Sequence, residues 1–456
     1  MRGARSLLVL LVLAAGLGAY IYFVESGRDL TDPETRKEKV FAIEPGKIEE
    51  VELRSVSGDT TTLKKNDQTW QIVKPVTTAA DQYTVSSVVS ALETLEMERS
   101  LDDAPAAGAQ FGLEPARMSV AFKAAGDATE HRLNIGNKTP TGSDLYARIE
   151  GQPKLFLIAS HLEDTLNRST FDLREKSVLK FERDNVDAIR IAAAGAPAIT
   201  LARNGADWKL TAPVDTRAES SAVDTLVNRA ASATFKSVVA GEPTPAAEAD
   251  LRKYGLDKPR FVIELGAGSN RASLAIGNKL DDGSLYARDL SKPLVVTVDA
   301  ALLTDLTKTA DDFRVKDVFA FKPYTALGLE LSRAGSTFGF EKSTPAGGDA
   351  AAAADVWKQT KPEAKDVNQT GMTDLLNTLS SLRADRFVPS AAASGEDLVV
   401  VARSGDAAKP VEERVTLRKS GATVHAIRAN EAGAAIVPTA DFDKAVNQLK
   451  ELTGTK

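Results

Sequence analysis

Two tyrosine–arginine pairs in this sequence have the residue types and spacing of a binding surface. Tyr146 stands two residues before Arg148, and Tyr286 two residues before Arg288. Residues at i and i+2 of a strand share one face, and both types are enriched at the energetic centres of interfaces. They therefore form either a repeated contact surface or, in the interpretation we favour, tyrosines packed across a sheet with each arginine paired to a local carboxylate.

Two basic pairs follow at a second recurring position, Arg174 with Lys176 and Arg314 with Lys316. They are suited to contact an anionic polymer or to tie one domain to the next, and we favour the structural role. These eight residues are the candidates for an interaction surface.

Motifs for catalysis or cofactor binding are weak. Gly136-Asn137-Lys138-Thr139 and Gly277-Asn278-Lys279 lack the upstream glycine of a phosphate loop. Ser177-Val178-Leu179-Lys180 has an S-x-x-K form without its partner motifs. The three histidines, His131, His161 and His425, show no metal-ligand spacing. We expect no enzyme activity, no catalytic residue, no cofactor and no metal.

Composition limits the function further. The chain has 456 residues, 43% hydrophobic and 26% charged, which is typical of globular proteins with about three domains. Lys plus Arg number 57 against 63 Asp plus Glu, a net charge of −6, and this balance argues against a nucleic-acid partner. Because cysteine is absent, disulfides, cysteine-ligated metals and thiol nucleophiles are excluded.

The N-terminus predicts a membrane anchor. Residues 6–24 carry no charge, and as a helix they would span roughly 28 Å, close to the thickness of a bilayer core. Arg2 and Arg5 precede this run, so the N-terminus is expected in the cytoplasm and the rest of the chain outside it. A cleaved signal peptide is the alternative, although the apolar run is longer than such peptides need. Nothing later is apolar enough to span again.

The remainder of the chain is a repeat. Four landmarks of a first copy return in the same order at offsets of 143, 141, 140 and 140 residues. They are Phe111-Gly112-Leu113 with Tyr254-Gly255-Leu256, Ile135-Gly136-Asn137 with Ile276-Gly277-Asn278, Leu145-Tyr146-Ala147-Arg148 with Leu285-Tyr286-Ala287-Arg288, and Leu173-Arg174-Glu175-Lys176 with Phe313-Arg314-Val315-Lys316. Such periodicity indicates a tandem array.

A third, degenerate copy is indicated by Trp357, which follows Trp70 and Trp208 at the equivalent point of the unit. His425-Ala426-Ile427-Arg428 falls where the third Tyr-Ala-Arg element belongs. This copy lacks the Phe-Gly-Leu and Ile-Gly-Asn signatures and contains an alanine-rich insertion at 345–355.

Within each copy the spacing of apolar residues changes from every second residue, typical of strands, to about every 3.6 residues, typical of a helix, and then back. Strands are predicted at 50–54, 60–64 and 69–73, then a helix through Val85, Val88 and Leu92, then four more strands and a short terminal helix. The predicted fold is α+β: an N-terminal transmembrane helix and three tandem repeats of antiparallel strands, each with a central amphipathic helix. The expected boundaries are anchor 1–25, tether 26–46, and repeats at 47–184, 185–324 and 325–456.

These features resemble a bacterial family of membrane-anchored, extracytoplasmic repeat proteins of unknown function, commonly encoded beside gliding-motility-type ABC transporters. The resemblance rests on the anchor, Trp70-Gln71-Ile72 with Pro75, Ala80-Asp81 and the four landmarks. It covers nearly the whole chain, and it implies an ABC permease and a companion extracytoplasmic subunit as partners.

Three functions remain open at this point. The first is a non-enzymatic accessory or scaffold subunit of such a transport complex, held in the inner membrane by residues 6–24 with its bulk in the periplasm. The second is a module that binds an envelope polysaccharide or peptidoglycan. The third is a hydrolase whose carboxylate pair the sequence does not reveal.

Overall fold

The computed structural model describes residues 37–101, 108–127, 129–242, 244–343 and 355–455. The expected anchor and most of the expected tether lie outside the described residues, as does nearly all of the alanine-rich insertion. The chain divides into two compact units, one ending at Lys176 and one spanning Ser177–Lys456. Repeat 1 forms the first unit, and repeats 2 and 3 form the second.

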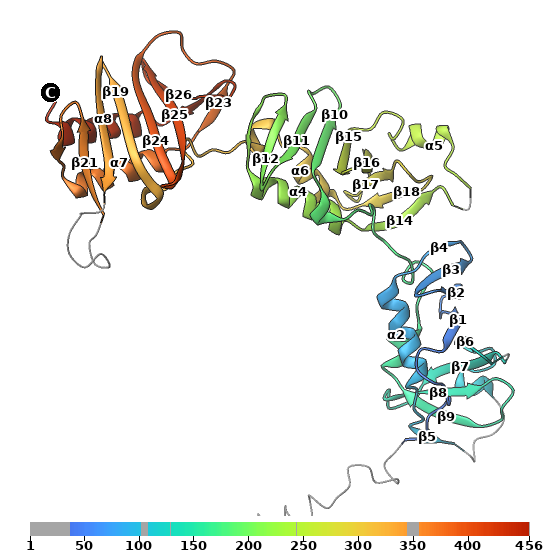
Figure 1. The fold of residues 1–456 in the computed structure, drawn as a ribbon. Coiled ribbons are helices and arrows are strands. Elements are labelled where there is room, and N and C mark those ends of the chain that lie inside the picture. The colour runs from blue at the N-terminus through green and yellow to red at the C-terminus, as the bar shows by residue number, and fades with distance from the viewer. Residues whose placement is uncertain (1–36, 102–107, 128, 243, 344–354, 456) are drawn as a thin grey trace, which may run out of the picture. The chain divides into compact units, whose positions relative to one another are not determined.

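Each repeat folds into one nine-stranded antiparallel sheet, and the three sheets share a single strand order (Figure 1). The order in repeat 1 is β4-β3-β2-β1-β6-β7-β8-β9-β5. Its strands are β1 (Ile48–Arg54), β2 (Thr60–Asn66), β3 (Thr69–Lys74), β4 (Thr78–Ala79), β5 (Arg99–Ser100), β6 (Met118–Ala124), β7 (His131–Lys138), β8 (Asp144–Ile149) and β9 (Leu155–Ala159). The prediction of antiparallel tandem repeats is confirmed, the third copy included.

Repeats 2 and 3 follow with the corresponding strands. In repeat 2 these are β10 (Ala188–Ala193), β11 (Ile199–Asn204), β12 (Asp207–Ala212), β13 (Thr216–Ala218), β14 (Phe235–Ala240), β15 (Phe261–Ala267), β16 (Asn270–Lys279), β17 (Leu285–Asp289) and β18 (Val295–Val298). In repeat 3 they are β19 (Ala326–Arg333), β20 (Ser336–Ser343), β21 (Val356–Lys361), β22 (Lys365–Asp366), β23 (Arg386–Val388), β24 (Glu396–Asp406), β25 (Lys409–Ser420), β26 (Thr423–Arg428) and β27 (Ala434–Val437).

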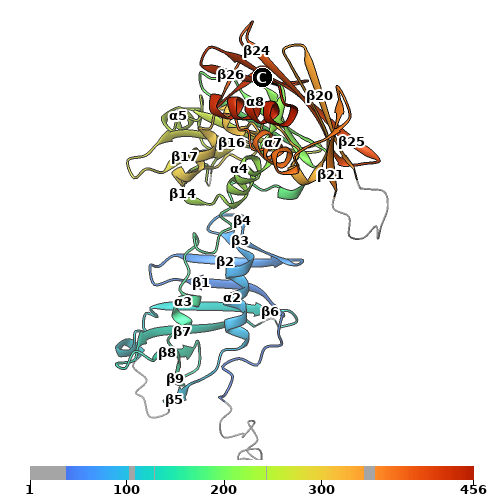
Figure 2. The same ribbon diagram turned by 90° about the vertical axis from the view of Figure 1, so that its left-hand side faces the viewer.

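Helices cover one face of each sheet. In repeat 1, α2 (Gln82–Glu93) and α3 (Leu162–Leu166) lie across the sheet (Figure 2). The residues of α2 at spacings of three and four, Val85, Val88 and Leu92, are buried against strand residues such as Val51 and Leu133. Repeat 2 has α4 (Ser220–Ser232) and α6 (Leu303–Leu306) in these positions, and repeat 3 has α7 (Gln369–Ser380) and α8 (Thr439–Thr453). The short helix α5 (Glu248–Lys253) of repeat 2 packs instead with Tyr254 and Tyr286.

The opposite face of each sheet carries ion pairs between neighbouring strands. In repeat 1, Glu50 on β1 pairs with Lys64 at 3.0 Å and Lys123 at 3.5 Å. In repeat 3, Arg403 lies over Gly328 to reach Glu341 at 2.6 Å, and a Cβ at Gly328 would stand only 2.7 Å from the guanidinium. Alternation along the strands places these polar residues opposite the core.

The tryptophan of each repeat is buried, with Trp70, Trp208 and Trp357 between 3% and 7% exposed. In repeats 1 and 3 the first residue of the main helix is a glutamine whose side chain hydrogen-bonds the backbone N and O of the tryptophan. The side chain of Gln369 accepts from Trp357 N at 2.8 Å and donates to the carbonyls of Trp357 and Val367, each at 2.9 Å. Gln82 makes the same three bonds around Trp70.

Segments between the repeats extend the sheets. Repeat 2 ends in η6 (Ala310–Phe313), and the chain then continues as an extended strip, residues 313–318, which we call the linking segment. On one side Glu219 N donates to Phe313 O at 2.8 Å, beside the β13 edge. Further along, Val318 N donates to Leu382 O at 3.0 Å, in repeat 3. The linking segment therefore belongs to both repeats of the second unit.

The same pairing opens repeat 1. Val40 N donates to Leu95 O at 2.9 Å, Met97 N donates to Glu38 O at 2.8 Å, and Phe41 is buried in the core at 6% exposure. Residues 37–46, expected in the solvated tether, are thus part of the first repeat's fold, because Val40 and Phe41 have apolar partners there.

The terminal helix differs between repeats. It is short in repeats 1 and 2, as expected, but α8 in repeat 3 has 15 residues and ends at Gly454, whose φ is +73°. Leu452 of α8 packs on α7 beside Gly371, and Lys365 Nζ donates to Thr453 O at 3.2 Å, next to the β22 edge. In repeats 1 and 2 the corresponding corner, at the start of the main helix, is occupied by the segment that leaves the repeat. There Asp81 N donates to Leu173 O and Glu219 N donates to Phe313 O. The expectation of a short helix was wrong for repeat 3, where α8 packs at the corner that an extended segment occupies in repeats 1 and 2.

Candidate functional site

The two tyrosines of the candidate surface are half-buried against aromatic neighbours. Tyr146 on β8 packs against Phe111, with ring centroids 4.6 Å apart, and Tyr286 on β17 packs against Tyr254 at 4.5 Å. Phe111 ends the short helix η3 (Gly108–Phe111), and Tyr254 follows α5. Each tyrosine therefore holds a connecting loop against the face of the sheet opposite the main helix.

The arginines of these pairs find partners inside their own repeats. Arg148 Nη2 lies 2.7 Å from Glu114 Oε1, in the same loop that covers Tyr146. Arg288 Nε donates to Lys292 O at 2.9 Å. Arg148 thus pairs with a carboxylate of its own repeat, whereas Arg288 bonds a backbone carbonyl instead of the expected carboxylate. The two tyrosine–arginine pairs lie on different sheets.

The Phe-Gly-Leu and Ile-Gly-Asn landmarks form a single contact. A Cβ on Gly277 would stand 2.2 Å from Tyr254 O, so only glycine permits this approach. Asn278 N donates to Tyr254 O at 2.8 Å, and the register of β16 with β17 shifts between Ile276 and Lys279. Gly136 approaches Phe111 O in the same way, with a Cβ distance of 2.1 Å. Repeat 3 has lost both landmarks, and β25 pairs with β26 without a register shift.

The basic pairs lie on the segments that leave repeats 1 and 2. Arg174 and Arg314 are each 6% exposed and bridge to Ala80 and Ala218 at the sheet edges. Lys176 Nζ donates to Asp172 O at 3.2 Å, whereas Lys316 is exposed to solvent. The buried arginines are therefore placed for packing rather than for contact with a polymer.

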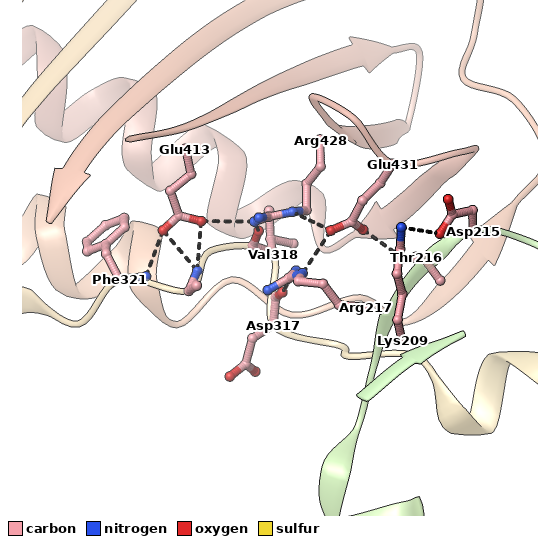
Figure 3. Close-up of polar contacts among 11 residues, drawn as sticks. Lys209, Asp215, Thr216, Arg217, Asp317, Val318, Phe321, Glu413, Arg428 and Glu431 are labelled. Carbon is pink, nitrogen blue, oxygen red and sulfur yellow. Dashed lines mark hydrogen bonds and ion pairs between the residues drawn. The ribbon is translucent and has the colours of Figure 1, made fainter. Parts of the chain in front are cut away.

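Around the linking segment, repeats 2 and 3 are joined by a row of charged side chains (Figure 3). Glu431 accepts from Arg217 Nε at 2.8 Å, from Thr216 Oγ1 at 2.8 Å and from Arg428 Nε at 2.9 Å. Arg217 also donates to Asp317 O at 2.9 Å, and Arg428 donates to Val318 O. We call Arg217, Arg428, Glu413 and Glu431 the junction network.

Glu413 anchors the far end of the junction network. It is 7% exposed, accepts from Arg428 Nη1 at 3.0 Å, and accepts from Phe321 N at 2.7 Å and Ala320 N at 2.9 Å. Charge-assisted bonds of this kind are shorter and stronger than neutral ones. The carboxylate thereby fixes the backbone just after the linking segment.

The electrostatics of the network keep the Glu431 carboxylate charged. Burial alone would raise the pKa of Glu431, but the positive charges of Arg217 and Arg428 outweigh it and hold that pKa below its usual range. A carboxyl with a lowered pKa is a poor general acid at neutral pH, because such a group needs a pKa near the working pH. Glu431 acts as a fixed anion between two arginines.

Sequence reasoning missed most of this junction network. One signal was present: Glu413 shares the inward face of β25 with Val415 and Leu417, where alternation predicts an apolar residue. Arg217 and Glu431 carry no such sign, because their contact joins residues 214 positions apart.

Other chemistry-bearing residues take local roles. His131 lies against Phe122, with centroids 5.2 Å apart, and pairs with Asp127 at 2.9 Å. That hydrogen bond, with others from Thr129, lowers the pKa of Asp127 to about 2. Within the described ranges no three His, Asp or Glu side chains are grouped to hold a metal ion.

None of the helices in the described part of the chain is long and apolar enough to cross a bilayer. The expected anchor at 6–24 lies outside that part.

The family of the chain follows from a profile match over these repeats. The profile of a domain of unknown function, DUF4340, matches residues 70–209 and again 208–398. The protein belongs to this family. Both matches begin at or beside a core tryptophan, Trp70 or Trp208, so each starts at the third strand of one repeat and runs into the next. No curated protein and no solved structure matches the chain.

Proposed function

We propose that the protein is a non-enzymatic, membrane-anchored accessory or scaffold subunit of an ABC-type, gliding-motility-like transport complex. Residues 6–24 hold it in the inner membrane with the N-terminus in the cytoplasm, and the three repeats stand in the periplasm. Its partners are an ABC permease and a companion extracytoplasmic subunit, which it contacts by surface complementarity.

The observation that carries this proposal is the use of every recurring motif in building the fold. The tyrosines hold loops, the glycines permit close backbone contacts, and the buried arginines lie on segments between repeats. What remains for a partner is the ion-paired face of each sheet, where Lys64 and Arg403 are about half exposed. Broad polar faces of this type suit a scaffold in a multi-protein assembly.

The electrostatics add support against a hydrolytic role. Among the described carboxyl groups, every shifted pKa is lowered, including those of Asp305 and Glu431. A carboxylate pair for glycoside or peptide hydrolysis needs one partner shifted the other way, towards neutrality.

A polymer-binding module is the second candidate, and one groove favours it. In repeat 3 a polar groove of about 660 Å³ lies between α7 and α8, lined by Asn377, Arg383, Lys444 and Gln448. Amides and charged groups are common in carbohydrate sites. However, the tyrosine–arginine pairs that a ligand module would group in a groove do not line this one.

The test is in-cell cross-linking of the full chain with a C-terminal tag, followed by detergent purification and mass spectrometry. Enrichment of an ABC permease and an extracytoplasmic companion over a control is the expected result. The control carries residues 1–36 fused to an unrelated periplasmic protein. Recovery of the chain alone would contradict the proposal, and recovery of glycan fragments would favour the polymer-binding module.

A further inference from the structure

Arg314, on the linking segment, is a buried cation with little compensation. Its side chain is 7% exposed, and its guanidinium lies 3.7 Å above the ring of Phe387. The carboxylate at ion-pair distance from it is Asp311, 3.4 Å away, and this partner is itself 53% exposed, so solvent screens its charge. Within the residues that the structure describes, Arg314 Nε is buried and has no hydrogen-bond acceptor.

The charged groups at the junction leave Arg314 weakly compensated. Arg217 and Arg428 both bind Glu431, and Arg428 also binds Glu413. Arg314 has only the half-exposed Asp311 at ion-pair distance, and the nearby Lys316 makes the local charge positive. The oxygens of Glu413 also accept from the backbone at Ala320 and Phe321.

The remaining nearby charges do not compensate Arg314. Asp317 Oδ1 lies 3.3 Å from Arg383, and its Oδ2 lies 3.7 Å from Lys322. Lys316, exposed at the rim, adds a further positive charge.

A cavity of about 20 Å³ lies among these groups, lined by Arg217, Arg314, Lys316, Phe387, Arg428 and Glu431. A cavity needs about 10–15 Å³ to hold one water molecule. The space therefore suits a single particle of water size, and chloride is only slightly larger than water.

We propose that the junction between repeats 2 and 3 binds one monovalent anion of about the size of chloride, held by Arg314 Nε and the neighbouring arginines. A buried charge with weak compensation is costly. An anion would both accept from Arg314 Nε and add the negative charge that a neutral water lacks. Burial lowers the pKa of Arg314, which agrees with an under-compensated guanidinium. The bound anion links the segment leaving repeat 2 to the surface of repeat 3. This site is independent of the transport partner.

Binding is measured by chloride-35 NMR line broadening on the full chain in detergent, with titration by bromide. The wild-type protein is expected to broaden the chloride line, and bromide to reverse the broadening. Arg314→Gln should abolish the excess width, while Arg252→Gln, on the exposed surface of α5, should leave it unchanged. Equal broadening by Arg314→Gln and wild type would overturn the proposal.

If Arg314→Gln folds poorly, two further measurements test the proposal. Lys316→Gln removes only an exposed rim charge, and it should weaken chloride binding by about threefold. Bromide soaked into crystals of the unaltered protein should give an anomalous peak beside Arg314 Nε. Unchanged affinity in Lys316→Gln, or no peak at that position, would show that the junction is hydrated by water only.

Discussion

Single residues in this protein mostly stabilise contacts between elements, and buried Asp305 shows how. It is 1% exposed and pairs with Arg229 on α4 and with Lys308. Burial alone would raise the pKa of Asp305, but the hydrogen bonds from Lys308 and Arg229 outweigh burial and lower it. The carboxylate therefore ties α6 to α4 in its charged form.

Asp305→Asn should reduce the free energy of unfolding by about 3 kcal/mol at neutral pH, because it leaves two cations facing a neutral group. Since the folded-state pKa is lowered, the stabilisation is present above the ordinary carboxyl pKa and is lost as pH falls through the folded value. Urea denaturation followed by tryptophan fluorescence measures both effects. Asp299→Asn, an exposed helix cap that asparagine also satisfies, should change stability by less than about 0.5 kcal/mol. Equal effects of the two variants would contradict this account.

Gly277→Ala tests the contact between the two glycine landmarks. The added Cβ would stand 2.2 Å from Tyr254 O and 3.2 Å from the backbone of Gly255, so the loop or the strand must move. We expect a loss of about 3 kcal/mol. Gly268→Ala is the control, because its φ is +59° but nothing lies within 4 Å of its Cβ, and its cost should be about 1 kcal/mol. Thermal unfolding in which Gly277→Ala is no worse than the control would refute the close contact.

At the scale of elements, the sequence predicted what local periodicity encodes. Strands such as β1 and β3 and the helix α2 were expected within a few residues of their observed bounds, because alternation and 3.6-residue spacing are local patterns. The two-residue strands β4 and β22 and the bridge between Lys39 and Glu96 were missed, since pairing with distant segments creates them. The same reason hid the contact between Arg217 and Glu431, whereas the candidate tyrosines and arginines were visible by repetition alone.

In repeats 1 and 3 a glutamine bonds the buried tryptophan, and Gln369, at the start of α7, gives a prediction for that element. Gln369→Leu removes three hydrogen bonds to the backbone of β21 and its turn, and these backbone groups are only partly exposed. We expect repeat 3 to lose about 2 kcal/mol. Hydrogen exchange should rise at residues 356–369 and stay unchanged in repeat 1. The control is Thr370→Ala, at an exposed position of α7. Gln359→Leu is less suitable because Gln359 is itself buried. If hydrogen exchange at residues 356–369 is as slow in Gln369→Leu as in the wild type, this side chain does not stabilise the region.

At the scale of the second unit, the junction network determines how firmly repeats 2 and 3 are joined. Glu431→Gln replaces the fixed anion between Arg217 and Arg428 with a neutral amide and should widen the distribution of distances across the junction. The chain has no cysteine, so two introduced cysteines, at Asp207 and Ala407, can carry spin labels for distance measurement. Glu412→Gln, exposed on the neighbouring position of β25, is the control and should leave the distribution narrow.

The pH dependence of this junction follows from the lowered pKa of Glu431. The stabilisation by its charge is complete above the ordinary value near 4.5 and is lost as pH falls through the lower folded value. The wild-type distance distribution should therefore stay narrow at pH 5 and widen only in more acidic solution. A broad distribution at neutral pH in the wild type would contradict a firm junction.

The long helix α8 also has a consequence for how such arrays change in evolution. Repeats 1 and 2 each present a sheet edge to an outgoing strand, as Ala80 and Ala218 do, whereas α8 occupies that corner in repeat 3. A repeat inserted by gene duplication before repeat 3 would continue from the outgoing strand of repeat 2, which pairs with a sheet edge. At the equivalent corner of repeat 3 an incoming strand would meet α8 instead of a free edge. In relatives whose equivalent of repeat 3 passes a strand to a further copy, the helix that corresponds to α8 should therefore be short.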